Sequence, residues 1–307
     1  MTNVFIDGSA GTTGLRIADR LGTRNDIFLI KLSEEMRKDT SARKEAINSA
    51  DIVFLCLPDA AAIEAVSLAD NPNVRIIDTS TAHRTNPDWT YGMPELKQQR
   101  ERIAASHRIA NPGCHASGFV ALVAPLVENG LIKPDTALTC FSLTGYSGGG
   151  KKMIAEYESA DRDPLLKAPR QYALTQQHKH LKEMVAICGL ETTPVICPIV
   201  ADFYSGMEVT VPLFARDVKG TIANIENLYQ AYYTNGLIRF DNATDADGLL
   251  SASAFADRDD MRVSVYGNEE RILLTARFDN LGKGASGAAI QNMNVLLGID
   301  ETTGLTV

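Results

Sequence analysis

The 307-residue sequence has no long run of hydrophobic residues. Its longest apolar stretches, such as residues 52–57, are the length of a strand and far short of the roughly 20 residues that a membrane-spanning helix needs. The N-terminus has neither a basic start nor a long apolar core, so we expect no signal peptide. These absences predict a cytoplasmic protein without a membrane partner.

The sequence also lacks a dense run of basic residues. Its 30 Lys and Arg residues stand against 38 Asp and Glu residues, which gives a formal net charge of −8 at pH 7. The nearest approach to a basic cluster, at 37–38 and 43–44, is interrupted and is typical of a solvated helix face. Nucleic-acid-binding proteins usually carry a basic face, so we expect no nucleic-acid partner. The same acidity disfavours a substrate carried on an acidic protein, because like charges repel at close approach.

The cysteines lack the pattern of a disulfide framework or a zinc site. There are five, their spacing is irregular, and no CxxC pair occurs. Cys56 and Cys140 lie in apolar, strand-like stretches, where a cysteine usually serves as core packing. We therefore expect no metal centre, and Cys114 is the cysteine whose surroundings differ.

The composition that is present is that of an ordinary soluble globular protein, with 45% hydrophobic and 22% charged residues. A short apolar segment at 4–6 runs directly into a glycine-rich turn, and apolar residues then recur at helical spacing from Leu15 to Leu21. Strand, glycine turn and helix form the context of a dinucleotide-binding loop, in which the backbone approaches a pyrophosphate at a helix N-terminus. The GxxGxxG spacing departs from the commoner GxGxxG, and a plain turn is the alternative. The predicted cofactor-binding residues of the loop are Gly8, Ala10, Gly11, Thr12, Thr13 and Gly14.

Three more strand-like stretches follow, at 27–32, 52–57 and 74–78, each leading toward a turn or a helical segment. This alternation predicts an α/β fold with a parallel, doubly wound sheet, which binds ligands at the carboxyl ends of its strands. Ser33 follows the second strand, and Arg37 is near enough to meet a 2′-phosphate, which favours NADP. Glu34 stands close to the position of an NAD-type acid and favours NAD.

The segment around Cys114 predicts a strand, a turn and a helix. The Asn-Pro-Gly turn at 111–113 ends the strand and places Cys114 in the first turn of a helix that continues through the apolar residues 119–127. The positive end of a helix dipole stabilises a thiolate, the reactive form, and free N–H groups there can stabilise an oxyanion. The sequence therefore predicts a nucleophile at Cys114, with a buried structural cysteine as the alternative.

A nucleophilic cysteine needs a base, and the chain has five histidines. His178 and His180 form an HxH pair, which can be a metal half-site, a solvated turn or the source of the base. No third metal ligand stands out, and the sequence does not choose between the two histidines. His115 follows Cys114 directly, but successive helical residues point away from each other, so it is the weaker candidate.

Together these motifs resemble the N-acetyl-γ-glutamyl-phosphate reductase family in its shorter form, over nearly the whole chain. The most specific elements are the Asn-Pro-Gly-Cys sequence at 111–114 and Asn-Leu-x-Lys-Gly-Ala at 280–285. The other matching segments are 8–14, 78–84, 91–96, 147–151, 178–183 and 291–294.

The resemblance implies a Rossmann dinucleotide-binding domain at 1–113 and 288–307 and an α+β catalytic and dimerisation domain at 114–287. It implies a homo-oligomer, dimer or tetramer, that uses NADPH to reduce N-acetyl-γ-glutamyl phosphate to N-acetylglutamate semialdehyde in arginine biosynthesis. Phosphate is released as Cys114 forms a thioester. The remaining residues that it assigns are Tyr172 with His178 or His180 for catalysis, Asn280 for the cofactor, and Asn111 and Glu183 for the substrate. Arg84 and Lys151 are candidates for binding phosphate or carboxylate, because such anions need charged donors.

The sequence departs from the family in three places. His115 stands where the family more often has a tyrosine. Lys151 ends a segment that ends in arginine in the long form, and 197–202 differs from the corresponding stretch of that form. Aspartate-semialdehyde dehydrogenase is the nearest alternative, a non-catalytic redox sensor that binds a dinucleotide is a second, and a lysine-pathway reductase acting on a carrier-bound substrate is a third. Residues 241–270 carry no functional prediction.

Overall fold

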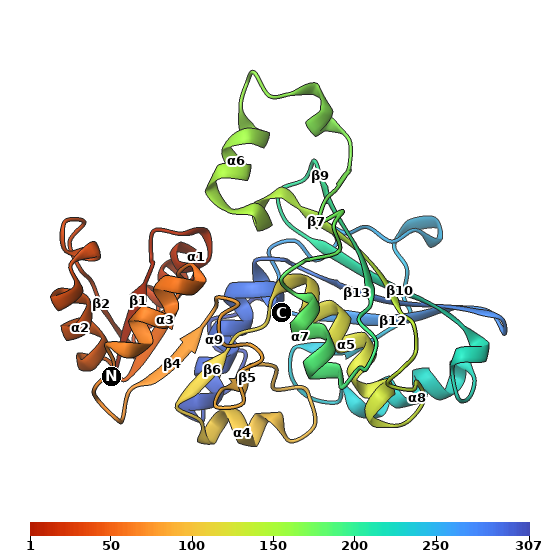
Figure 1. Ribbon diagram of the computed structural model, residues 1–307, viewed down its shortest axis with the longest axis horizontal. Coiled ribbons are helices and arrows are strands. Elements are labelled where there is room, and N and C mark those ends of the chain that lie inside the picture. Colours follow the sequence, from red (N-terminus) through yellow and green to blue (C-terminus); the bar gives the residue numbers. More distant parts are fainter. The chain divides into compact units, whose positions relative to one another are not determined.

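The computed structural model describes all 307 residues, which divide into two compact units. The first unit comprises Met1–Gly113 and Ala285–Leu305, and the second comprises Cys114–Gly284 with Thr306–Val307. The chain therefore leaves the first unit directly before Cys114 and returns to it near its end (Figure 1). None of the helices combines the length and the apolar character needed to cross a membrane.

The first unit is built on a six-stranded parallel sheet with the strand order β2-β1-β3-β4-β6-β5. This confirms the predicted α/β fold with a parallel sheet. The strands predicted at 27–32 and 52–57 are each two residues shorter than expected, because the chain turns away at their carboxyl ends. The strands are β1 (Thr2–Asp7), β2 (Ile27–Ile30), β3 (Ile52–Leu55), β4 (Arg75–Asp78), β5 (Thr90–Tyr91) and β6 (Arg108–Ala110).

Helices cover both faces of this sheet, as buried parallel strands require. On one face Ile17 of α1 and Met293 of α9 pack with Ile6 of β1. On the other face Ile47 of α2 packs with Phe5 of the same strand, because successive strand residues point to opposite sides. The helices are α1 (Thr12–Leu21), α2 (Thr40–Ser49), α3 (Asp59–Ser67), α4 (Gln99–Ala105) and α9 (Gly287–Leu297), with a short 3₁₀ turn η1 (Met36–Lys38).

The second unit contains a seven-stranded mixed sheet in the order β11-β12-β13-β10-β7-β9-β8. Its strands are β7 (Thr139–Gly145), β8 (Arg170–Gln171), β9 (Val195–Ala201), β10 (Met207–Phe214), β11 (Ile238–Phe240), β12 (Met261–Gly267) and β13 (Arg271–Phe278). Its helices are α5 (Cys114–Glu128), α6 (Gly150–Glu158), α7 (Leu181–Cys188) and α8 (Ile222–Tyr232). The short helical turns are η2 (Tyr146–Gly149), η3 (Pro164–Lys167), η4 (Ala215–Asp217) and η5 (Ala246–Gly248). A π-helical turn, η6 (Gly282–Ser286), contains the point at which the chain returns to the first unit.

One face of the second sheet is a core face. Helix α5 is buried from His115 to Leu126 and lies so close to the sheet that a Cβ at Gly118 would be 2.5 Å from the Val209 side chain. Helix α7 packs on α5, and α8 contacts β12. The loop that carries α6 projects beyond β7 and β9 (Figure 1) and is anchored by a small cluster of Tyr157, Leu166 and Val200.

Candidate active site

The glycine loop after β1 is pressed against its neighbours. Gly8 has φ +88°, and a Cβ there would lie 2.3 Å from the carbonyl oxygen of Cys56. A Cβ at Gly14 would lie 2.5 Å from the carbonyl oxygen of Gly8. Helix α1 begins after Gly11 without a side-chain cap, and the buried Thr12 hydroxyl has no hydrogen-bond partner. The loop therefore offers donors without partners at a helix N-terminus, which is the arrangement that holds a phosphate.

A cavity of about 560 Å³ adjoins this loop within the first unit. Three cationic side chains, Lys31, Arg37 and Lys38, line it together with the carboxylates of Glu34 and Asp7, and Asp7 is paired with Arg43 at 2.9 Å. Ser33 shapes the turn that carries Arg37, because its carbonyl oxygen accepts the Arg37 N–H at 3.1 Å. The cavity can take the adenosine end of a dinucleotide beside positive charge.

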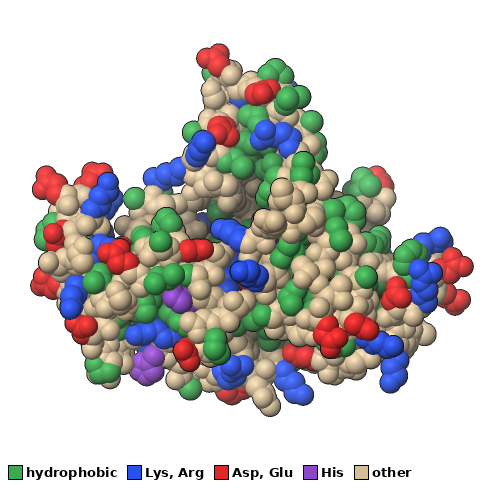
Figure 2. Space-filling view, in the orientation of Figure 1, with side chains coloured by type: hydrophobic (Ala, Val, Ile, Leu, Met, Phe, Trp, Pro, Cys, Tyr) green, Lys and Arg blue, Asp and Glu red, His purple; other side chains and the backbone are tan.

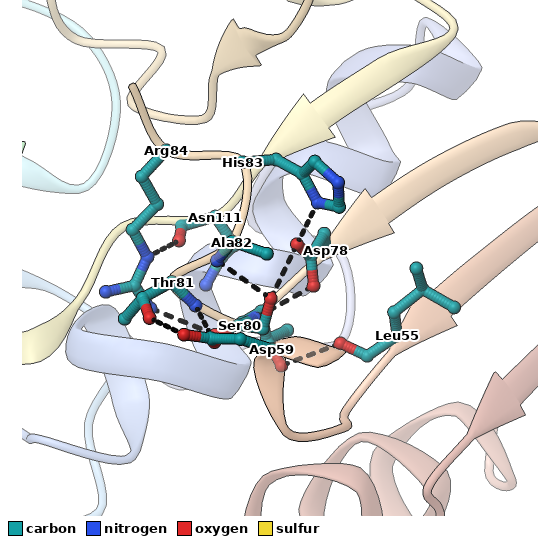
Figure 3. A network of polar contacts seen from close by, with 10 residues as sticks. Leu55, Asp59, Asp78, Ser80, Thr81, Ala82, His83, Arg84 and Asn111 are labelled. Atoms are coloured by element: carbon teal, nitrogen blue, oxygen red, sulfur yellow. Dashed lines mark hydrogen bonds and ion pairs between the residues drawn. The ribbon is translucent and has the colours of Figure 1, made fainter. Parts of the chain in front are cut away.

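The segment after β4 is fixed by one buried carboxylate (Figure 3). Asp78 accepts hydrogen bonds from the backbone N–H of Ser80 at 2.9 Å and from its hydroxyl at 2.7 Å, and its oxygen lies 2.7 Å from Nδ1 of His83. The His83 ring stacks on Trp89 with centroids 4.1 Å apart. This network makes the segment rigid up to Arg84.

Arg84 and Asn111, both predicted to bind substrate, are tied into the backbone of the first unit. The buried Arg84 guanidinium donates to the carbonyl oxygens of Asn111 and Thr79, each at 2.9 Å (Figure 3). The Asn111 amide donates to the carbonyl oxygen of Ala285 at 3.0 Å and accepts from the Asn292 side chain at 3.1 Å. These bonds hold in place the Asn-Pro-Gly turn that directly precedes Cys114.

Cys114 is the first residue of α5, as the sequence predicts, and its side chain is partly exposed. A Cβ at Gly284 would lie only 3.1 Å from the Cys114 Cβ, so a glycine at 284 leaves room beside the thiol. None of the five cysteines forms a disulfide, and burial raises the pKa of Cys56 to about 12 and that of Cys140 further still. Cys56 and Cys140 therefore remain protonated packing residues.

Four aromatic rings of the second unit form one cluster: His115, Tyr172, His178 and His180. The ring centroids of His178 and His180 are 4.7 Å apart, and the His115 centroid lies 5.2 Å from that of His178 and 5.6 Å from that of His180. Burial raises the pKa of Tyr172, and the nearby Cys114 raises it further. The structure thus brings the predicted residues Cys114, Tyr172, His178 and His180 together.

His115 belongs to this cluster, although helix geometry made it the weaker candidate for the base. Its Nδ1 lies 2.6 Å from the Ser142 hydroxyl and its Nε2 lies 2.6 Å from the Tyr172 hydroxyl. Burial, with smaller contributions from His178 and Lys179, lowers the pKa of His115 to about 3. The ring is therefore neutral at physiological pH, with both nitrogens in hydrogen bonds.

Ser142 is the residue of the cluster that the sequence analysis missed. Alternation along β7 places residues 140, 142 and 144 on the core face, where a serine must find a polar partner. A serine at a core-facing position of an apolar strand was the sequence signal that could have predicted a buried polar contact at Ser142.

The two histidines of the HxH pair differ in their surroundings. Nδ1 of His178 accepts the backbone N–H of His180 at 3.2 Å, and the His178 carbonyl oxygen accepts the N–H of Leu181 at 3.0 Å. His178 thereby lies directly before the N-terminus of α7, of which His180 is the N-cap residue. Burial and the neighbouring Lys179 lower the pKa of His178. A neutral His178 with Nδ1 as acceptor carries its proton on Nε2.

The other predicted residues are dispersed over the second unit. Lys151 is exposed in the first turn of α6, and Glu183 is buried in the first turn of α7. The Asn280 amide accepts from the N–H of Gly206 at 2.9 Å and donates to the Ser147 hydroxyl at 3.0 Å. No group of three or more His, Cys, Asp or Glu side chains is placed to hold a metal ion.

Both units match family models. Residues 3–106 match the semialdehyde dehydrogenase NAD binding domain, and residues 114–280 match the semialdehyde dehydrogenase dimerisation domain. The chain is 45% identical over 306 residues to N-acetyl-gamma-glutamyl-phosphate reductase 2 of Pseudomonas putida, with 96% of each chain covered. It is 42% identical over 317 residues to the Nostoc sp. protein of the same name, with 98% of each covered. The chain belongs to the N-acetyl-γ-glutamyl-phosphate reductase family.

This membership confirms the resemblance drawn from the sequence motifs, and it makes the chain an oxidoreductase with a nicotinamide dinucleotide as cofactor. Solved structures of aspartate semialdehyde dehydrogenases share the fold of this family member at much lower identity. The Vibrio cholerae enzyme II superposes with a TM-score of 0.73 at 17% identity, covering 97% of this chain and 99% of that chain. The Francisella tularensis enzyme superposes with a TM-score of 0.73 at 14% identity, covering 97% and 100%.

Proposed function

We propose that this enzyme reduces N-acetyl-γ-glutamyl phosphate to N-acetylglutamate semialdehyde and releases phosphate, as a cytoplasmic step of arginine biosynthesis. The observation that carries the proposal is the position of Cys114, which begins α5 and directly precedes His115 of the ring cluster. The relatives at 42–45% identity carry the name of this reaction. Five free cysteines fit a reducing compartment.

The first chemical step forms a bond between the Cys114 sulfur and the acyl carbon of the substrate. The bond from that carbon to the phosphate oxygen breaks, phosphate leaves with the electron pair, and a thioester remains. The positive end of the α5 dipole stabilises both the attacking thiolate and the oxyanion on the attacked carbon.

The second step reduces the thioester to the aldehyde. The dinucleotide, when bound, supplies the hydride that reduces the acyl carbon. The resulting oxyanion collapses, the bond from carbon to sulfur breaks, and Cys114 leaves as a thiolate ready for the next turnover. Hydrogen-bond donors of the ring cluster stabilise the oxyanion while it exists.

We assign different roles to the two histidines of the HxH pair. His178 serves as a neutral donor through Nε2, because its Nδ1 accepts a backbone N–H and its pKa is lowered. His180 then carries out the proton transfer, including delivery of a proton to the leaving phosphate.

We propose NADP as the cofactor. The donors without partners at Thr12 and the close approach of backbone at Gly8 fit the pyrophosphate, and the lining of the adjoining cavity fits a phosphorylated ribose. Lys31, Arg37 and Lys38 outnumber the two carboxylates there, Glu34 and Asp7, and Asp7 is already paired with Arg43. A 2′-phosphate needs cationic donors. The Candida albicans aspartate semialdehyde dehydrogenase structure, with a TM-score of 0.69, contains NADP.

We propose that the enzyme is a homodimer or homotetramer in which copies meet on the outer face of the second sheet. Large apolar side chains on this face are exposed, with Phe141 at 46%, Val195 at 51% and Leu273 at 44%. The strand register continues the face through Cys197 and Thr210, which pair with Phe141. An apolar sheet face of this kind marks a protein–protein interface. On the face drawn in Figure 2, basic side chains lie among acidic ones.

The experiment that tests the proposed function runs the reaction in reverse. Phosphate-dependent reduction of NADP⁺ is measured with N-acetylglutamate semialdehyde and, separately, with aspartate semialdehyde, for the wild type and for Cys114→Ser. Turnover with the acetylated aldehyde alone, abolished in the variant, is the expected result. Turnover with aspartate semialdehyde alone would assign the enzyme to another substrate, and no turnover in a folded, NADP-binding protein would refute the proposal.

A further inference from the structure

A chain of three polar groups crosses the core of the second unit and ends beside Cys114. The Ser142 hydroxyl on β7 lies 2.6 Å from Nδ1 of His115 on α5, and Nε2 of His115 lies 2.6 Å from the Tyr172 hydroxyl. Ser142 is 0% exposed and His115 is 3% exposed, so water does not compete for these bonds. The Tyr172 hydroxyl thus contacts the residue that directly follows Cys114 at the start of α5, and Cys114 contributes to the raised pKa of Tyr172.

The direction of the two hydrogen bonds follows from counting donors and acceptors. A neutral imidazole has one N–H donor and one acceptor nitrogen, so His115 donates at one end of the chain and accepts at the other. The ring is neutral because its burial excludes the charged form. Two arrangements are therefore possible, and they differ in which hydroxyl donates to the ring.

Burial selects between them. If His115 donated to Ser142, the Ser142 hydrogen would point into a core where its oxygen has no hydrogen-bond partner other than His115. A buried donor without an acceptor is unfavourable and rare. If Ser142 instead donates to Nδ1, then Nε2–H donates to the Tyr172 oxygen and every group in the core is satisfied. The hydroxyl hydrogen of Tyr172 is then available for an acceptor other than His115 and Ser142.

We propose that Ser142 and His115 are positioning residues that orient the Tyr172 hydroxyl as a hydrogen-bond donor toward the reacting centre at Cys114. Tyr172 donates to the oxyanion that forms on the carbon attached to the Cys114 sulfur, and His115 acts only through Tyr172. The inference rests on the proposed function, since it names the donor that stabilises that oxyanion.

The test is a double-mutant cycle between His115 and Tyr172, because a residue that acts through another has no effect once the other is removed. We compare kcat and KM of the wild type, His115→Phe, Tyr172→Phe and the double variant in phosphate-dependent NADP⁺ reduction. His115→Phe is expected to lower kcat about tenfold, the size of one lost hydrogen bond to a charged group, with KM changed by less than about threefold. In the Tyr172→Phe background it is expected to lower kcat by less than about twofold.

Two further variants separate positioning from structure. His115→Gln keeps a donor and an acceptor in a similar space and is expected to restore most of the kcat that His115→Phe loses. Ser142→Ala removes the donor to Nδ1, so His115 can change tautomer and accept a hydrogen bond from Tyr172 in place of donating one. The substitution is therefore expected to lower kcat when Tyr172 is present and to leave kcat unchanged in the Tyr172→Phe variant. The melting temperature of each variant is measured alongside.

Equal losses from His115→Phe in both backgrounds, or no loss in either, would overturn the proposal. The same double-mutant cycle can be measured without a substrate. Its readout is the rate at which iodoacetamide alkylates Cys114, followed by mass spectrometry of the peptide that contains Cys114. If the wild type turns over neither aldehyde, the proposed function fails. The alkylation cycle then still decides whether His115 acts on Cys114 through Tyr172.

Discussion

The backbone N–H of His180 donates to Nδ1 of His178 at 3.2 Å, so the two histidines are unequal although they are two residues apart. A protonated His178 would place an N–H against this backbone donor, at the positive end of α7. Both the hydrogen bond and the helix dipole oppose the imidazolium form. We therefore propose that the motif holds the His178 ring in its neutral state and that His180 carries out the proton transfer.

Glutamine substitutions test this division. His178→Gln keeps a neutral N–H donor and is expected to retain about a tenth or more of wild-type kcat, whereas His180→Gln loses a general acid–base group and drops by about 10²-fold or more. The measurement is kcat for both variants from pH 6 to 9. Equal losses, or a larger loss in His178→Gln, would reverse the assignment.

Burial of His115 makes stability depend on pH in a predictable direction. The pKa of His115 falls from 6.5 to about 3 on folding, so below pH 6.5 the unfolded chain binds a proton that the folded protein does not. The free energy of unfolding therefore decreases as the pH falls from 6.5 toward 3, by at most about 1.4 kcal/mol per pH unit from this residue. Urea unfolding of His115→Gln is expected to show a smaller decrease than the wild type over pH 6.5 to 4.5. Replacing the exposed His107 by glutamine is the control, and it should follow the wild type.

Gly8 is expected to tolerate no side chain. With φ at +88° and the Cys56 carbonyl oxygen 2.3 Å from the position of a Cβ, Gly8→Ala combines a left-handed backbone with a direct clash. We expect it to lower the free energy of unfolding by about 2 kcal/mol or more and to weaken NADP binding. Gly130→Ala is the matched control, because Gly130 has φ +67° with open space around it, and a loss of about 1 kcal/mol is expected there. Chemical unfolding and NADP titration measure both effects.

The cations of the cavity in the first unit should discriminate between the two dinucleotides. Arg37→Ala removes a donor suited to a 2′-phosphate, so KM for NADP is expected to rise about tenfold or more while KM for NAD changes by less than about threefold. Lys44→Ala on α2 is the control, since Lys44 pairs with Asp70 at the surface and is not part of the cavity lining. A parallel rise in both KM values would contradict the placement of the 2′-phosphate near Arg37.

The outer face of the second sheet should carry the contact between copies. Phe141→Glu places a charge in the middle of an apolar face and is expected to shift the protein toward monomer in analytical ultracentrifugation. Leu249 is 69% exposed in a loop of the same unit, and Leu249→Glu is expected to leave the sedimentation unchanged. Equal behaviour of the two variants would place the contact elsewhere.

Local patterns were enough to predict much of this molecule. The alternation of apolar segments and glycine turns predicts the parallel sheet, and the Asn-Pro-Gly turn places Cys114 at the start of α5, since both depend on neighbours in sequence. The surroundings of His115 depend instead on β7 and on the segment before α7, which meet α5 only in the folded unit. Helix geometry separates Cys114 from His115, as expected, but it carries no information on Ser142 or Tyr172. Likewise, the charge of Arg84 suggests an anion site, whereas tertiary structure gives it two backbone carbonyl oxygens.

Helix α9 covers one face of the first unit's sheet, whose strands are synthesised long before α9 itself. Ile290 and Met293 of α9 pack with Val4 and Ile6 of β1 and with Ile17 of α1. During synthesis that apolar face stays open while the ribosome makes the whole second unit, because α9 begins only at Gly287. The dinucleotide-binding unit can therefore finish folding only after the whole second unit and α9 have been synthesised. A nascent chain that stops before α9 will present this face to chaperones and proteases.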